Sequence, residues 1–178
     1  EALLRHENDL HLDLRTLSFR FVFDPPGPPK PAEALQSYAA NGSGTVQGAA
    51  DHERENQIEF WQRAAKDGFT DQAARKSAQT FRAAFDALDK RLAAQPYLLG
   101  GALSVLDIAW FIYANRLALG GYPLARLHPN VSRWFETLRV RPEFAKEIAM
   151  PPEMTQRLDA TRRAHAQAGK SLEQVAGF

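Results

Sequence analysis

Apolar residues recur at intervals of three and four along almost the whole chain, and no run alternates with a period of two. Intervals of three and four place side chains on one face of a helix, so the pattern predicts an all-α fold. Proline and glycine mark the expected ends of the helices. We expect helices over residues 3–23, 32–40, 51–66, 70–94, 105–119, 129–140, 142–150 and 152–168, with a last capped turn at 171–174.

The first expected helix carries two apolar faces. The first face holds Leu10, Leu14, Leu17 and Phe21, and the second holds Leu12, Phe19 and Phe23. A polar patch of His11, Arg15 and Ser18 falls between them. A helix with two apolar faces requires two partners, so we expect it to contact the rest of this domain and also a second subunit or another domain.

The helix over 105–119 is apolar almost all round, since only Asp107, Asn115 and Arg116 are clearly polar. Such a helix is typical of the middle of a bundle. We therefore expect an orthogonal helical bundle built around this buried central helix.

A capping box is expected at the start of this central helix. The Ser104 hydroxyl can accept from the amide of Asp107, while the Asp107 carboxylate accepts from the amide of Ser104. Leu103 and Ile108 stand where a hydrophobic staple closes over the same turn. The box gives Asp107 a structural role and explains why an acid occurs in the most apolar part of the chain.

Composition bounds the remaining possibilities. The 178 residues are 44% hydrophobic, which predicts one domain over 1–178. Within it we expect a Pro/Gly-rich insert at about 24–50, with a flexible loop at 41–48, and a polar helical tail at about 151–178. A net charge of +1 argues against nucleic-acid binding. Asp107 lies within the most apolar stretch and argues against a membrane span. The chain has no cysteine, which is compatible with a cytoplasmic location.

A search for chemistry gives little. The five histidines show no metal-ligand spacing, so no metal site is predicted, and no Gly-x-Ser-x-Gly motif occurs. Basic residues gather in the tail, at Arg157, Arg162, Arg163 and Lys170. They indicate either a solvated helix face or, as a less favoured alternative, an anion site.

Three segments together resemble the carboxy-terminal helical domain of glutathione transferases. They are the helix ending Phe85–Leu92 with the following Tyr97–Gly101, the capped segment Ser104–Ala109, and Pro129–Phe135 followed by Arg139–Phe144. The resemblance extends over about residues 73–146. The segment Phe60–Phe69 further resembles the bacterial β-etherase-like branch of that family.

The resemblance implies that a full-length protein transfers glutathione to a hydrophobic electrophile, as in detoxification, and forms a homodimer. Glu1 begins near the first helix of the helical domain, so we expect the family's thioredoxin-like domain, with its catalytic residues, to be absent here. No catalytic residue is therefore assigned. Glutathione enters only as the expected co-substrate. The candidate substrate-binding residues are His11, Arg15, Ser18, Trp110, Tyr113 and Tyr122.

Each candidate has a simpler reading, as part of a solvated strip or of the core. The function also has an alternative, because the same helical fold can serve as a non-catalytic protein-binding or assembly module.

Overall fold

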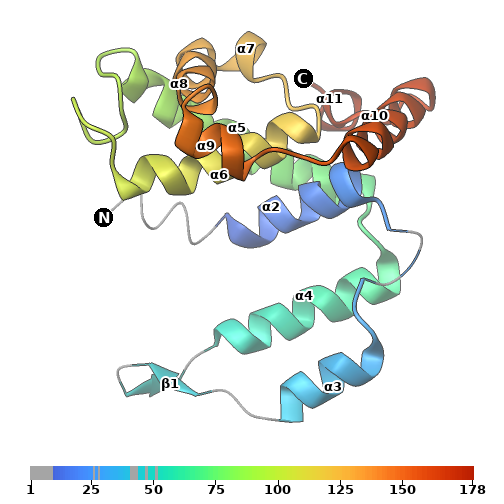
Figure 1. Ribbon diagram of the computed structural model, residues 1–178. Helices are drawn as coiled ribbons and strands as arrows, with labels where there is room; N and C mark the ends of the chain where they lie inside the picture. The colour runs from blue at the N-terminus through green and yellow to red at the C-terminus, as the bar shows by residue number, and fades with distance from the viewer. Residues whose placement is uncertain (1–9, 26, 28, 41–43, 47, 51) are drawn as a thin grey trace. The chain divides into compact units, whose positions relative to one another are not determined.

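The computed structural model describes residues 10–25, 27, 29–40, 44–46, 48–50 and 52–178 (Figure 1). The chain divides into two compact units, residues 1–24 with 71–178 and residues 25–70. Each is described by itself. The organisation as a single domain stays a prediction.

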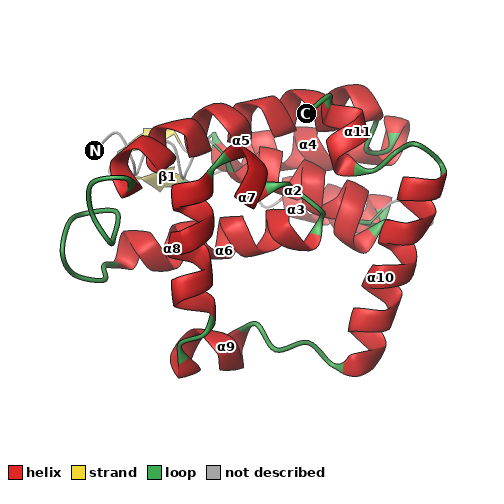
Figure 2. Ribbon diagram, turned by 90° about the horizontal axis from the view of Figure 1, so that it is seen from above, coloured by secondary structure: helices red, strands yellow, loops and turns green. Residues whose placement is uncertain are grey.

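The first unit is a helical bundle, which confirms the predicted all-α fold. Its elements are α2 (His11–Ser18), the π-helix η1 (Phe19–Phe23), α5 (Asp71–Leu92), α6 (Val105–Leu119), α7 (Leu124–Leu127), α8 (Pro129–Arg139), α9 (Pro142–Glu147), α10 (Pro152–Gln167) and α11 (Leu172–Ala176). Helices α2, α8 and α11 all contact α5, and α2 and α8 also contact α6. Figure 2 shows α10 at the opposite side of this unit from α8.

The long helix α5 buries the face that its periodicity predicts. The buried residues of that face are Ala74, Ala78, Phe81, Phe85, Leu88 and Leu92. Aromatic rings of α6 pack against it, with Tyr113 5.9 Å from Phe81 and Trp110 6.0 Å from Phe85, between ring centroids. Such contacts add to the free energy gained from burial alone. Helices α5 and α6 therefore form the centre of the core.

The first expected helix, over residues 3–23, does not end as a regular α-helix. Its expected start falls within residues 1–9, which lie outside the described residues. Its buried face is as predicted, with Leu10, Leu14, Leu17 and Phe21 all inside. Its last turn is a π-helix, in which the amide of Asp24 donates to Phe19 O at 2.9 Å. Asp24 adopts the left-handed region (φ 37°), which aspartate tolerates better than most residues. Pro25 then prevents the helix from continuing.

The central helix α6 is not covered all round, although its sequence predicts burial. Leu106, Trp110, Ala114 and Leu117 are buried. Val105, Ile108 and Ile112, here called the exposed strip of α6, are 80%, 45% and 50% exposed. In sequence this strip is as apolar as the buried face of α6, and it differs from that face only in its tertiary surroundings.

The second unit contains α3 (Ala32–Ala40) and α4 (Glu53–Asp67), which pack against each other. The segment at 41–48, expected to be a flexible loop, includes part of a two-stranded antiparallel hairpin, β1 (Thr45–Val46) and β2 (Ala49–Ala50), while residues 41–43 lie outside the described residues. Gly48 has φ +82° in the tight turn, a conformation that glycine adopts without penalty. The turn of this hairpin depends on the backbone conformation that Gly48 adopts. It does not depend on an alternation of apolar and polar residues, which is the usual sequence signal for a strand.

A buried histidine links the α6–α7 turn to α5. His128 is fully buried, and its Nε2 lies 2.9 Å from the Tyr122 hydroxyl. Burial raises the pKa of Tyr122, so its hydroxyl stays protonated beside this nitrogen. The other ring nitrogen, Nδ1, makes no hydrogen bond with any described residue, although Asp86 Oδ1 lies 3.4 Å away. His128 is therefore a neutral side chain of the core.

Acidification is expected to destabilise the protein through His128. Burial lowers the pKa of its imidazole, an effect that the carboxylates of Asp86 and Asp89 oppose and Arg82 reinforces. The unfolded chain then binds a proton more readily than the folded one, so the free energy of unfolding falls as the pH drops below about 6.5 toward the folded pKa. Urea unfolding between about pH 7.5 and about pH 5 measures this slope. His128→Gln should flatten it, and an unchanged slope in this variant would refute the assignment.

Candidate functional site

The N-terminus of α6 is fixed by the carboxylate of Asp107, which is completely buried. The capping box is formed: Asp107 Oδ2 accepts from the Ser104 amide at 2.9 Å, and the Ser104 hydroxyl oxygen lies 3.4 Å from the Asp107 amide. The other oxygen, Oδ1, accepts from Leu98 N at 2.9 Å and from Trp134 Nε1 at 3.0 Å. One side chain thus joins the 97–104 segment, α6 and α8. The staple between Leu103 and Ile108 stays a prediction.

An apolar groove, here called the α6 groove, lies along the helix that this cap positions. Its volume is ≈ 650 Å³, within the range of ligand pockets. It is lined by Phe23 of η1; Leu103; Ile108, Phe111, Ile112, Asn115, Arg116 and Leu119 of α6; Glu143, Phe144 and Glu147 of α9; and Ile148, Ala149, Met150 and Met154.

The walls of the groove follow from local sequence. Ile108, Ile112, Asn115 and Leu119 recur at intervals of three and four, so they share one face of α6. Pro151 lies in the connection from α9 to α10 and prevents the two helices from joining into one. Figure 2 shows this connection as a loop that links the two helices.

Polar groups of opposite charge flank the apolar surface. On one side, the Arg116 guanidinium lies 5.4 Å from the ring centroid of Phe23, a cation–π contact. On the other side stand Glu143 and Glu147 of α9. Glu143 accepts from Arg141 Nε at 2.7 Å, and hydrogen bonds to its own backbone and to Arg141 lower its pKa. The α6 groove therefore suits an apolar molecule with polar ends.

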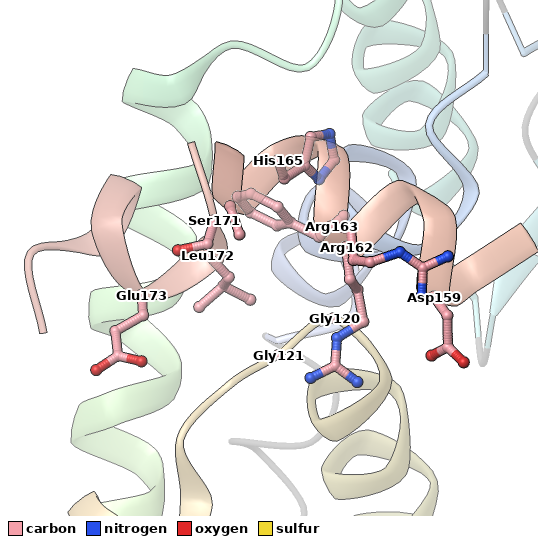
Figure 3. Close-up of a pocket in the computed structure, with 11 residues that line it drawn as sticks. Gly120, Gly121, Asp159, Arg162, Arg163, His165, Ser171, Leu172 and Glu173 are labelled. Atoms are coloured by element: carbon pink, nitrogen blue, oxygen red, sulfur yellow. The ribbon is translucent and has the colours of Figure 1, made fainter. Parts of the chain in front are cut away.

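A second, more polar pocket, here called the α10 pocket, lies between α10, α11 and the turn after α6 (Figure 3). Its volume is ≈ 410 Å³. It is lined by Phe21, Gly120, Gly121, Asp159, Arg162, Arg163, His165, Ala166, Ser171, Leu172 and Glu173. Nearby, Arg20 donates to Asp71 Oδ1 at 2.8 Å and lowers the pKa of that carboxyl.

The candidate residues from the sequence occupy two places, the core and helix α2. Trp110 and Tyr113 lie together in the core, with ring centroids 5.6 Å apart, and Tyr122 packs on Phe85 and is also buried. On α2, His11 is exposed, Arg15 is half-buried and Ser18 is buried. None of these six is among the described residues that line the α6 groove. Their role in substrate binding stays a prediction.

Several groove residues escaped the sequence analysis. Ile108 was noticed only for the staple, and Ile112, Phe144 and Met154 were not singled out. The available signal was the apolar character of α6 on every face.

The described residues hold no group of three or more His, Asp or Glu side chains placed to bind a metal ion. None of their helices is long and apolar enough to cross a membrane.

The central helix α6, with its capping box, is flanked by the long helix α5 and by α8, which begins with Pro129. This arrangement defines a class of helical domain. The family model for the glutathione S-transferase C-terminal domain matches residues 56–137, which extend from α4 into α8. Over these residues the chain is similar to the glutathione S-transferase C-terminal domain. No curated protein matches the chain, and no solved structure matches it. The resemblance to the β-etherase-like branch stays a prediction.

Proposed function

We propose that the α6 groove binds the hydrophobic electrophile of a glutathione S-transferase-like protein. The observation that carries this proposal is the exposed apolar face of the central helix, which lines a groove of ≈ 650 Å³ and lies within the residues that the family model matches. Exposed apolar surface of this kind is costly in water and is typical of binding sites.

The composition of the walls favours a flat aromatic substrate. Phe23, 39% exposed, supplies an accessible ring, and the buried rings of Phe111 and Phe144 pack beneath the groove. Met150 and Met154 supply flexible, polarisable side chains that adapt to ligands of varied shape. Arg116 and Asn115 can donate hydrogen bonds to a polar group at the edge of such a molecule.

On family grounds, glutathione is the proposed co-substrate. Its thiolate would attack the electrophilic carbon, and the leaving group would depart with the electron pair of the broken bond. The contribution of this chain is to hold the electrophile in place, because positioning two reactants is itself a large part of such catalysis. No residue of this chain is assigned to activation of the thiol.

A homodimer in the cytoplasm is the proposed state of the full-length protein. The second apolar face of the first helix supports a contact with another copy, because Leu12 and Phe19 are only half-buried. Phe23, expected on the same face, lines the α6 groove instead.

A protein-binding module is the alternative function. It is favoured by Val105, which is 80% exposed and continues the exposed strip beyond the described lining of the groove. A partner helix could cover a strip of this length, whereas a small molecule would leave Val105 in water.

The test is a titration of the purified chain with a neutral aromatic fluorophore such as Nile red, followed by competition with an aromatic electrophile. We expect saturable binding of one fluorophore per chain and complete displacement by the electrophile. Binding that does not saturate, or that the electrophile does not reverse, would refute the proposal.

A further inference from the structure

The α10 pocket combines an apolar floor with a basic rim. Phe21 and Leu172 are 1% and 2% exposed and form the apolar part. Arg162 and Arg163 come from the last turns of α10, and Ser171 is the N-cap of α11. The pocket thus places several hydrogen-bond donors around an apolar floor.

The arginines of this pocket are the notable feature. Most described arginines contact a carboxylate, a carbonyl oxygen or an aromatic ring, as Arg20, Arg63 and Arg75 do. By contrast, no ion pair or hydrogen bond with a described residue engages Arg162 or Arg163. Their guanidinium groups are permanently charged and remain available to a ligand.

The turn after α6 leaves space for one of these groups. Gly121 has φ +89°, and a Cβ at this position would come within 3.8 Å of Arg162 Nη2 and 3.9 Å of Nε. Figure 3 shows Arg162 and this turn on the same side of α10. The edge of the Arg162 guanidinium that carries Nε and Nη2 therefore lies beside Gly121, and these two N–H groups can bind a carboxylate side by side.

Two acidic residues, Asp159 and Glu173, also line the pocket and affect its net charge. Glu173 forms an ion pair with Arg126, so its charge is balanced from outside the pocket. Asp159 lies within the pocket, and no ion pair with a described residue balances it. Two arginines opposed by one free carboxylate leave the pocket with a net positive charge, which attracts an anion.

We propose that the α10 pocket binds a small organic monocarboxylate with an apolar body. The carboxylate lies on Arg162, with Arg163 and the Ser171 hydroxyl as further donors, and the apolar body rests on Phe21 and Leu172. This site is separate from the α6 groove, since the two share no described lining residue.

The test uses 3-phenylpropionate as the probe and the amide signals of Gly120 and Gly121 as the readout in two-dimensional NMR. We expect saturable shifts of these two signals. Arg162→Gln should weaken binding about tenfold, because a charge-assisted hydrogen-bonded pair is lost. Arg157→Gln is the matched control: it removes an exposed arginine of the same helix that lies outside the pocket lining, and it should leave binding unchanged.

Two further probes identify the chemistry. Neutral 3-phenylpropionamide should bind at least about tenfold more weakly than the acid, and inorganic phosphate, which has no apolar body, should also bind more weakly than the acid. Equal binding of the amide and the acid, tighter binding of phosphate, or equal effects of the two arginine variants would each overturn the proposal. Circular dichroism of each variant verifies that the helical content is retained.

Discussion

Replacing Asp107 by alanine is expected to lower the free energy of unfolding by about 3 to 5 kcal/mol, the largest effect on stability that we predict. The reason is the number of donors that its carboxylate satisfies. Without it, the amides of Leu98 and Ser104 and the indole N–H of Trp134 lose their acceptor. Asp107 is fully buried, so water does not readily replace the lost bonds. Urea unfolding followed by circular dichroism measures the loss.

Two further variants separate the contributions to this effect. Asp107→Asn retains the shape but turns one acceptor into a donor, which then faces backbone or indole N–H groups, so most of the loss should remain. Ser104→Ala removes only the capping hydroxyl and should cost about 1 kcal/mol. If Asp107→Ala costs no more than Ser104→Ala, the role assigned to the buried carboxylate is wrong.

Replacing Ile112 by glutamate is expected to weaken binding of a neutral aromatic fluorophore by at least about tenfold. Ile112 is 50% exposed and lies on the wall of the α6 groove. A carboxylate at this position is solvated by water in the free protein and loses that solvation when the ligand enters. Because the native side chain is half-exposed, the substitution should cost little stability. A fluorescence titration measures the dissociation constant.

Val105→Glu is the matched control. It makes the same change in charge on the same helix, at a position that is 80% exposed and not among the described residues lining the groove. Acidic residues are also favourable in the first turn of a helix, so α6 should be unharmed. If both variants bind the fluorophore as tightly as the unchanged chain does, the probe binds elsewhere. If Val105→Glu weakens binding as strongly as Ile112→Glu does, the groove is not the site.

Local interactions explain why so many helix ends agree with the sequence. α3 and α6 have the predicted bounds, and the capping boxes at Ser104 and Ser171 are formed. Caps, prolines and periodic faces act within a few residues, so the sequence reveals them directly. The π-helical turn at 19–23 and the short helix α7 were not predicted, because they depend on how the chain leaves the bundle.

The candidate site was harder to predict because apolar side chains serve the core and the groove alike. Trp110 and Ile112 are two residues apart on one apolar helix, yet Trp110 is fully buried and Ile112 is half-exposed. Which face of α6 is covered depends on α2, α5 and α8, whose positions no local pattern gives. The same holds for Arg162, since its location beside Gly121 depends on how α10 packs in the bundle.

A crystal structure of the chain with a neutral aromatic electrophile would show whether the uncovered face of α6 binds the hydrophobic ligand. We expect the ligand to lie between α6 and α9, in contact with Ile108, Ile112 and Phe144. A ligand seated instead against His11, Arg15 and Ser18 on α2, with the groove empty, would contradict it.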